Sequence, residues 1–260
     1  MAIYATGSTG YIGAQLSKSV IPIDVDLSKV ASMKRIKLKP KSTLIHLASI
    51  VGESRVREDQ EYSKKVNVLG SEILAEIALS QNVSRFIYVS SSHVYAKSNN
   101  PIREGDEIAP SSLYAEQKLE AENRILRLFS NEPHNLCIAR VFSVLGKNMK
   151  KGTLGWSIDR AHLAKVRYGM DQRDFLSPKQ IAQVIFDLAN IVSVPNIINV
   201  ATGIPTSIRN ATKTMRGIQD EKELDLYCEN NVSDSPYIVG DPSLLRSVLD
   251  LAPHVWSLEK

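Results

Sequence analysis

Short apolar runs alternate with helix-length amphipathic segments along most of this 260-residue chain. Such runs suit buried strands, and an amphipathic segment between two of them can return the chain across the face of a sheet. The pattern therefore predicts an α/β fold with a doubly wound parallel sheet. We expect strands at residues 2–6, 21–25, 43–48, 85–90, 136–142 and 196–200, and helices at residues 62–81, 112–129, 179–190 and 207–215.

The composition, 43% hydrophobic and 23% charged with a net charge of +4, is that of a globular protein. The densest basic stretch, residues 34–41, alternates with apolar residues, so we expect an exposed helix and turn and no nucleic-acid partner. No apolar stretch approaches the roughly 20 residues that cross a bilayer, and no signal peptide precedes the first strand. We therefore expect a cytoplasmic protein without a membrane partner, in which Cys137 is a buried reduced thiol.

Tyr114 and Lys118 lie four residues apart, and therefore on one face of the helix predicted at residues 112–129. An ammonium at that spacing favours ionisation of a phenol, whose pKa is otherwise about 10. Upstream, Ser90, Ser91 and Ser92 end an apolar strand and hold hydroxyl groups at the edge of the sheet. Together these residues predict an enzyme that moves a proton. His46, inside a strand, is expected to be a core histidine, and no cluster has the spacing of metal ligands, so we expect no catalytic metal.

Glycines at positions 7, 10 and 13 follow the first predicted strand and are expected to precede a helix. Gly7 permits a tight turn, Gly10 lets the backbone approach a pyrophosphate, and Gly13 allows close packing of helix on strand. The N–H groups and the positive helix end would then face phosphates. This placement predicts a dinucleotide site. We expect a Rossmann domain at residues 1–146, to which residues 176–200 return, and a small substrate-binding lobe at residues 147–175 and 201–260.

In this order and spacing, the motifs resemble those of the extended short-chain dehydrogenases/reductases, specifically the NAD-dependent epimerase/dehydratase family of nucleotide-sugar enzymes. The likeness covers nearly the whole chain. TGSTGYIG at residues 6–13 is similar to TGxxGxxG, LIHLA at 44–48 to VIHLA, VNVLG at 66–70 to vNvxGt, FIYVSSSHVY at 86–95 to fvyvSSsxvYg, YAEQK at 114–118 to YxxxK, RVFSVLG at 140–146 to RxxNvyG, RDF at 173–175 to RDF, and INVATG at 198–203 to yNvgsG.

The resemblance implies roles for the matched residues and NAD or NADP as cofactor. Tyr114 would be the general acid/base, Lys118 would lower its pKa and bind the nicotinamide ribose, and Ser91 would orient the substrate carbonyl. A nucleotide sugar would be the substrate, and a homodimer would form through helices 62–81 and 112–129. The implied cofactor contacts are Gly7, Thr9, Gly10, Tyr11, Ile12, Gly13, Asp26, Leu27, Leu47, Ala48, Ser49, Asn67, Ser90, Tyr114, Lys118 and Val144. The expected substrate contacts are Ser92, His93, Ser143 and Arg173, the last of which would meet the diphosphate.

The adenosine side departs from the family pattern. Only 33 residues separate Gly13 from Leu47, about one strand–helix unit too few. Asp26 and Leu27 resemble the third-strand pair that contacts adenine, in which case the second strand is missing and the sheet is shortened by that unit. Alternatively, Asp24 or Asp26 is itself the ribose-binding acid, on a foreshortened second strand. The preference between NAD and NADP stays open.

The substrate side departs as well, because Ser143 replaces the asparagine that often binds substrate, and Lys179 and Gln180 replace the acidic pair that usually follows the RDF element. Dehydration is disfavoured, because the serine run and His93 stand where dehydratases carry Thr-Asp-Glu. The prediction is hydride transfer, and specifically reduction of a 4-keto sugar nucleotide, since a reductase tolerates a trimmed adenosine site. An epimerase, which must retain its cofactor, is the alternative. A reductase of steroid or flavonoid type, with an apolar substrate, and a non-catalytic dinucleotide-binding sensor or scaffold are the others.

Overall fold

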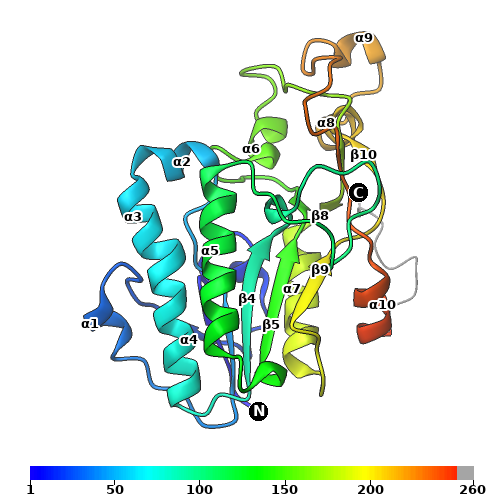
Figure 1. Cartoon of the computed structure of the whole chain (residues 1–260). Helices are drawn as coiled ribbons and strands as arrows, with labels where there is room; N and C mark the ends of the chain where they lie inside the picture. The colour runs from blue at the N-terminus through cyan, green and yellow to red at the C-terminus, as the bar shows by residue number, and fades with distance from the viewer. Residues whose placement is uncertain (251–260) are drawn as a thin grey trace.

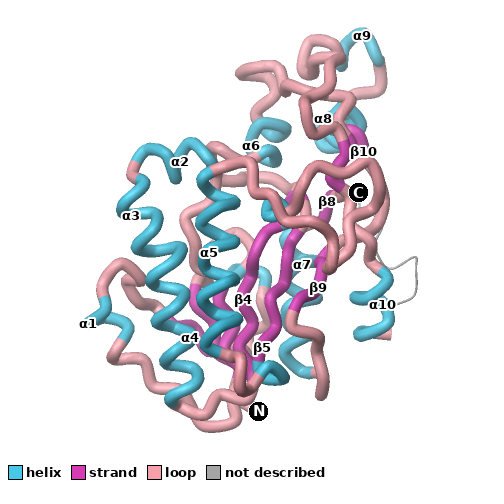
Figure 2. Tube along the Cα trace, viewed as in Figure 1, coloured by secondary structure: helices cyan, strands magenta, loops and turns pink. Residues whose placement is uncertain are grey.

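A sheet of six parallel strands, in the order β2-β1-β3-β4-β5-β9, forms the centre of the computed structural model, which describes residues 1–250. Figure 2 draws these strands in magenta. All six predicted strands are confirmed, and their bounds differ from the prediction by no more than two residues. The carboxyl ends of the strands lie along one edge, where open α/β sheets bind ligands. In sheet order the strands are β2 (Ile21–Ile23), β1 (Ile3–Thr6), β3 (Thr43–His46), β4 (Arg85–Ser91), β5 (Leu136–Val141) and β9 (Ile197–Val200).

Helices α4 (Gly70–Ser80) and α5 (Leu113–Leu128) lie side by side over one face of the sheet (Figure 1). The helix predicted at residues 62–81 is a continuous rod in which α3 (Gln60–Lys64) and a π-helical turn, Lys65–Leu69, precede α4. Apolar side chains of the rod and of α5 bury themselves against the strands, and Phe86 stacks on Phe129 with ring centroids 5.8 Å apart. The shorter helices on this side are α1 (Val30–Met33) and α2 (Glu53–Glu58).

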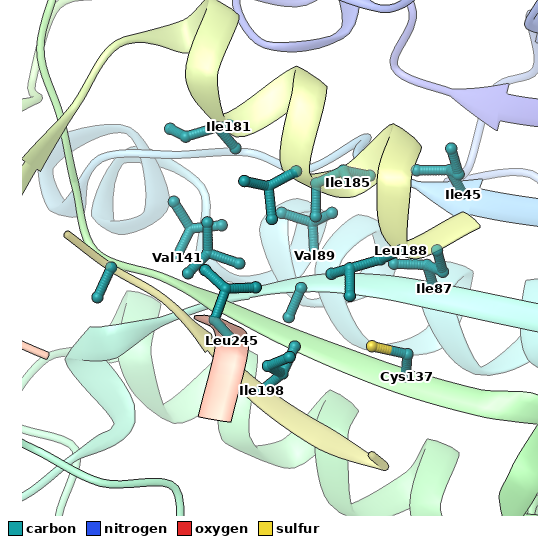
Figure 3. Close-up of a cluster of buried hydrophobic side chains, with 14 of the residues drawn as sticks. Ile45, Ile87, Val89, Cys137, Val141, Ile181, Ile185, Leu188, Ile198 and Leu245 are labelled. Carbon is teal, nitrogen blue, oxygen red and sulfur yellow. The ribbon is translucent and has the colours of Figure 1, made fainter. Parts of the chain in front are cut away.

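Helix α7 (Pro178–Asn190) covers the opposite face, so the sheet is doubly wound as predicted. The helix begins with a capping box, in which Ser177 and Gln180 bond each other's backbone N–H through their side chains. Its apolar stripe faces the strands. Figure 3 shows Ile181, Ile185 and Leu188 of α7 over Ile45, Ile87 and Val89, with Leu245 of α10 (Ser243–Leu249) in the same cluster. Burial of each such side chain contributes roughly 1.5–3 kcal/mol.

A smaller lobe lies beyond the carboxyl edge of the sheet (Figure 1). Its separate apolar cluster includes Leu145, Ile158, Phe175 and Ile208. The lobe holds a three-stranded sheet of β10 (Thr206–Ser207), β7 (Gln172–Arg173) and β11 (Tyr237–Ile238), a two-stranded pair of β6 (Ser143–Val144) and β8 (Phe175–Leu176), and helices α6 (Leu154–Asp159), α8 (Ile208–Arg216) and α9 (Glu221–Leu224). The domain division given above stays a prediction.

The connection from β1 to β2 is the main correction to the predicted fold. The expected helix after the glycine turn is only a single 3-10 turn, Gly13–Gln15, and the chain is already extended at Leu16. Because β2 begins at Ile21, no room is left for an α-helix with a developed dipole. β2 pairs with β1, with Thr6 opposite Ile23, and so occupies an edge of the sheet directly beside the glycine turn. Shortening relative to the family by one strand–helix unit stays a prediction.

None of the helices formed by residues 1–250 has the length and apolar character of a membrane-spanning segment.

Candidate active site

A cavity of about 650 Å³ opens at the carboxyl edge of the sheet, between the strand ends and the lobe. It is lined by the loops after β1, β3, β4 and β5, by the start of α5, and by residues of the lobe. Most of the predicted site residues therefore meet in one place. Those that line it are Gly7, Thr9, Gly10, Tyr11, Ile12, Gly13, Leu47, Ala48, Ser49, Ser90, Ser91, His93, Tyr114, Lys118, Ser143, Val144 and Arg173.

The glycine turn packs its backbone against itself and against the loop after β3. Gly7 has a φ of +69°, and a Cβ there would lie 2.6 Å from the backbone nitrogen of Ala48. A Cβ on Gly13 would lie 2.1 Å from the carbonyl oxygen of Gly7. The turn is fixed by a hydrogen bond from Gly10 N to Gly7 O of 2.9 Å. The residues after β1 thus present bare backbone to the cavity, as a pyrophosphate site requires.

Ser91, Tyr114 and Lys118 come together because β4 ends where α5 begins. Ser91 is the last residue of β4, and its hydroxyl lies close enough to the Tyr114 phenol to lower the pKa of that group. The first turn of α5 is capped by Ser112 Oγ, which accepts from Ala115 N at 3.2 Å. One turn later, Lys118 Nζ donates to the carbonyl oxygen of Val89 at 2.9 Å. These contacts join both motif residues of α5 to the end of β4.

Burial governs the electrostatics of this group. It lowers the pKa of Lys118 to about 8, although the charge of Glu122 opposes the shift. It raises the pKa of Tyr114 to about 12, against the influence of the Ser91 hydroxyl, which lowers it. The expected lowering of the phenol pKa by Lys118 is therefore not what this arrangement gives. The ammonium is directed to Val89 O and lies 4.7 Å from the centroid of the Tyr88 ring, so desolvation decides the pKa of Tyr114.

A family model described as the NAD dependent epimerase/dehydratase family matches residues 3–201 of the chain. This chain belongs to that family. The match confirms the family that the motifs predicted, and it includes the glycine turn, the serine run, Tyr114 and Lys118.

Two curated proteins align with this chain. A UDP-glucose 4-epimerase from Vibrio cholerae is 26% identical over 178 residues, which are 57% of this chain and 53% of the relative, so the match spans about half of the relative's length. A GDP-6-deoxy-D-talose 4-dehydrogenase from Aggregatibacter actinomycetemcomitans is 24% identical and covers 96% of this chain and 91% of the relative.

Two solved structures have the same fold. MoeE5 in complex with UDP-glucuronic acid and NAD superposes with a TM-score of 0.78 at 22% identity, covering 96% of this chain and 93% of that one. RMD from Pseudomonas aeruginosa complexed with NADPH also gives 0.78, at 21% identity, covering 96% and 92%.

Four of the predicted cofactor and substrate contacts do not line the cavity: Asp26, Leu27, Asn67 and Ser92. Asp26 is held locally, because its carboxylate accepts from Ser28 N at 3.0 Å and Ser28 Oγ at 2.6 Å and pairs with Lys29. These hydrogen bonds, led by the Ser28 hydroxyl, lower its pKa. Leu27 is buried in the core on the α4 side of the sheet, and Ser92 is buried in the 3-10 turn Ser92–Val94.

Asn67 supports the cavity wall from behind. Its amide oxygen accepts from Ser49 Oγ at 2.9 Å and from Ile50 N at 2.7 Å, and its amide nitrogen donates to Gln117 at 2.9 Å. It thereby ties the loop after β3 to helix α5. Ser90 reaches the cavity, but its hydroxyl donates to Glu122 Oε1 at 2.5 Å.

His46 is a satisfied core histidine, as predicted. Its ring nitrogens bond Thr6 Oγ1 at 2.7 Å and Ser71 Oγ at 2.8 Å, and burial lowers its pKa to about 3.

The sequence analysis missed two parts of the cavity lining: the carboxylate of Glu53 and a loop that covers the cavity, here called the roof. Glu53, at the start of α2, lines the cavity; its Oε2 accepts from Tyr114 N at 3.1 Å and its Oε1 pairs with Arg57. The roof is formed by residues 149–155, which bring Lys150 to the cavity as a third cationic residue beside Lys118 and Arg173. This loop touches the other wall, since Tyr11 Oη donates to Lys147 O at 2.7 Å. The lysine-rich, strandless composition after Gly146 was the available signal, but it does not say where the loop folds.

Proposed function

We propose that this chain uses a nicotinamide dinucleotide to reduce the 4-keto group of a nucleotide-linked sugar. The observation that carries the proposal is the single cavity in which a bare glycine turn faces Ser91, Tyr114 and Lys118 at the carboxyl edge of the sheet. A cytoplasmic homodimer formed through α4 and α5 is part of the same proposal.

The residues present fit a dinucleotide. Side chains on Gly7 or Gly13 would collide with the backbone of Ala48 or Gly7, so glycine is what allows the close-packed turn whose backbone lines the cavity where a pyrophosphate would lie. Lys118, buried but still largely charged below its pKa of about 8, lines the same cavity, and the resemblance implies that it binds the nicotinamide ribose. When bound, the reduced cofactor supplies the hydride for the carbonyl carbon.

In this mechanism Tyr114 gives its phenolic proton to the oxygen on which charge develops, and Ser91 donates a hydrogen bond to that oxygen. The raised pKa of Tyr114 suits this direction, because the phenol keeps its proton at neutral pH and is ready as an acid. Lys118 lines the same cavity, and the resemblance assigns to it the support of the phenolate that remains after proton transfer. An epimerase cycle begins with the opposite step, the removal of a proton by Tyr114.

The substrate side supports a nucleotide sugar. Arg173 reaches the cavity while its guanidinium is anchored by Asp171 at 2.8 Å, and Lys150 provides a second charge for a diphosphate. The relative aligned over 96% of this chain is named as a 4-dehydrogenase of a GDP-linked deoxysugar, which is oxidation–reduction at the same position. The short crossover after the glycine turn, with no α-helix dipole on the phosphates, supports a cofactor that is exchanged in every cycle.

A second candidate, a nucleotide-sugar 4-epimerase, is favoured by one contact. The hydrogen bond from Tyr11 to Lys147 O closes the roof over the glycine turn, which would help to retain a cofactor through oxidation and re-reduction. The relative from Vibrio cholerae is named as such an epimerase.

The test begins with mass analysis of whatever is released from the denatured, freshly purified protein, followed by titration of the stripped protein with NADH and NADPH. The reductase is expected to carry little cofactor, to bind a reduced dinucleotide reversibly and to oxidise it when a 4-keto sugar nucleotide is added. Tyr114→Phe should retain binding and lose at least about 100-fold in kcat, the usual size of acid–base catalysis. Tightly retained NAD with interconversion of 4-epimers would favour the epimerase. Binding with undiminished turnover by Tyr114→Phe would refute both.

A further inference from the structure

We propose that Asp171 is a positioning residue, which holds the guanidinium of Arg173 in place for the diphosphate of the nucleotide sugar. The inference rests on the proposed function, because it explains how one cation of that site is presented to the substrate. Asp171 was not among the residues that the sequence predicted for the site. It stands directly before β7, two residues before Arg173.

Arg173 lies between two aspartates that are both fully buried, Asp171 and Asp174. Asp174 serves the backbone of the lobe, because its carboxylate accepts from Thr202 N and Gly203 N, each at 2.8 Å. Asp171 serves the arginine, because its Oδ2 lies 2.8 Å from Arg173 Nη2. The two acids therefore fix the strand and the side chain of Arg173 separately.

The Asp171 carboxylate is itself fixed by a segment from far along the chain. Its Oδ1 accepts from Ser233 N at 2.9 Å, and its Oδ2 accepts from Ser233 Oγ at 2.6 Å. Ser233 lies in the loop before β11, and β11 pairs with β7 so that Tyr237 stands opposite Gln172. Strand pairing thus returns this loop to the Asp171 carboxylate, whose two oxygens are both held.

The guanidinium of Arg173 is oriented by two contacts. Nη2 donates to Asp171, and Nη1 donates to the carbonyl oxygen of Gln172 at 2.9 Å. A guanidinium has five N–H donors, so this anchoring leaves donors for a ligand, and the side chain lines the cavity. A side chain that is already ordered loses less conformational freedom when it binds than one that must first be ordered.

Asp171 also stabilises the charge of Arg173 in a poorly hydrated place. The Arg173 side chain is only 12% exposed. Burial lowers the pKa of Arg173, while the charge of Asp171 and its hydrogen bond oppose that shift. Lys150, the other cation proposed for the diphosphate, is exposed on the roof. Arg173 is therefore the fixed cation of the diphosphate site and Lys150 is the adaptable one.

The first test measures the binding of UDP and of GDP, each of which carries the diphosphate, to the cofactor-stripped protein by isothermal titration. Asp171→Asn removes the charge that faces Arg173, while the new amide oxygen can still accept from Ser233 N. We expect it to bind the diphosphate that the wild type prefers about tenfold or more weakly, with unchanged NADH binding. The matched control is Asp234→Asn, which makes the same change of charge at an exposed residue next to Ser233 and should bind as the wild type does.

A double-mutant cycle separates positioning from a general effect on the lobe. If Asp171 acts through Arg173, the double variant Asp171→Asn/Arg173→Ala should bind no more weakly than Arg173→Ala alone. Losses that multiply in the double variant would overturn the proposal. In turnover, Asp171→Asn should raise KM for the nucleotide sugar and leave kcat within about twofold, as expected when binding is lost equally in the ground state and the transition state.

Arg173→Lys keeps the test decisive if Asp171→Asn does not fold. The lysine retains the charge but lacks the fork that reaches both Asp171 and the Gln172 carbonyl, so we expect it to lose most of the affinity that Arg173→Ala loses. Full affinity for the diphosphate in Arg173→Lys or in Asp171→Asn would overturn the positioning role and leave the proposed function intact. If Asp171→Asn weakens diphosphate binding but the wild type reduces no 4-keto sugar nucleotide, the proposed reaction fails and the positioning role stands.

Discussion

Glu122 of α5 and Arg140 of β5 form an ion pair in which both side chains are almost fully buried, with Arg140 Nη2 2.7 Å from Glu122 Oε2. The same carboxylate accepts from Ser90 Oγ. Glu122 follows Lys118 by one helical turn, and its charge raises the pKa of that lysine. The pair therefore fixes the face of α5 that carries the motif residues to the strand ends that carry the serines.

Replacement of Glu122 by glutamine should destabilise the protein strongly, because Arg140 would keep its charge in a buried place without a counter-ion. We expect a loss of about 3–5 kcal/mol in the free energy of unfolding, measured by urea denaturation. The matched control is Glu61→Gln, which breaks the exposed pair of Glu61 and Lys65 and should cost about 0–1 kcal/mol. Equal losses in the two variants would contradict the assigned role.

The pH dependence should follow Lys118, whose pKa burial lowers from 10.5 to about 8. Since the unfolded chain binds this proton more tightly, the contribution of Lys118 to the free energy of unfolding rises with pH between those two values. Activity should change in the opposite sense and decline above about pH 8, as the ammonium that supports Tyr114 is lost. In Lys118→Arg the group stays charged, so the alkaline decline should move to higher pH in a profile of kcat/KM. A decline at the same pH in that variant would assign it to another group.

Gly13→Ala should damage the dinucleotide site more than the fold. The new methyl would lie 2.1 Å from the Gly7 carbonyl oxygen, so the turn must move. We expect a stability loss of about 1–3 kcal/mol and at least a tenfold weaker binding of NADH, measured by fluorescence titration. Gly105→Ala is the control, because a Cβ at Gly105 meets no atom within 4 Å. Normal NADH binding by Gly13→Ala would remove the glycine turn from the proposed site.

The parts of the fold that the sequence predicted are those that local pattern controls. Buried strands such as Arg85–Ser91 and Leu136–Val141 each contain a run of four consecutive apolar residues, and the spacing of Tyr114 and Lys118 places them on one helix face whatever surrounds the helix. The prediction of an α-helix after Gly13 was wrong. Glycine spacing predicts a turn, whereas the length of the following helix depends on where the next strand begins.

The parts of the site that were missed depend on packing between distant segments. Glu53 at the start of α2 and Lys150 in the loop after Gly146 reach the cavity from segments that carry no recognisable motif, and the Asp26 carboxylate instead accepts hydrogen bonds from Ser28, only two residues away. The raised pKa of Tyr114 has the same origin. A phenol and an ammonium at helical spacing predict a lowered value, but the burial of both groups is a property of the assembled fold.

Tyr11→Phe should separate the two proposed functions. The change removes the hydrogen bond of 2.7 Å that joins the glycine turn to the Lys147 carbonyl and leaves the ring in place. A bond of this kind contributes about 0.5–1.5 kcal/mol, so cofactor dissociation should accelerate by roughly two- to twelvefold in stopped-flow measurements. In a reductase limited by release of the oxidised cofactor, kcat should rise; in an epimerase, cofactor should be lost during turnover and the rate should decay unless NAD is added. Tyr62→Phe, at an exposed position on α3, is the control and should change neither rate. Unchanged dissociation in Tyr11→Phe would mean that the roof does not hold the cofactor.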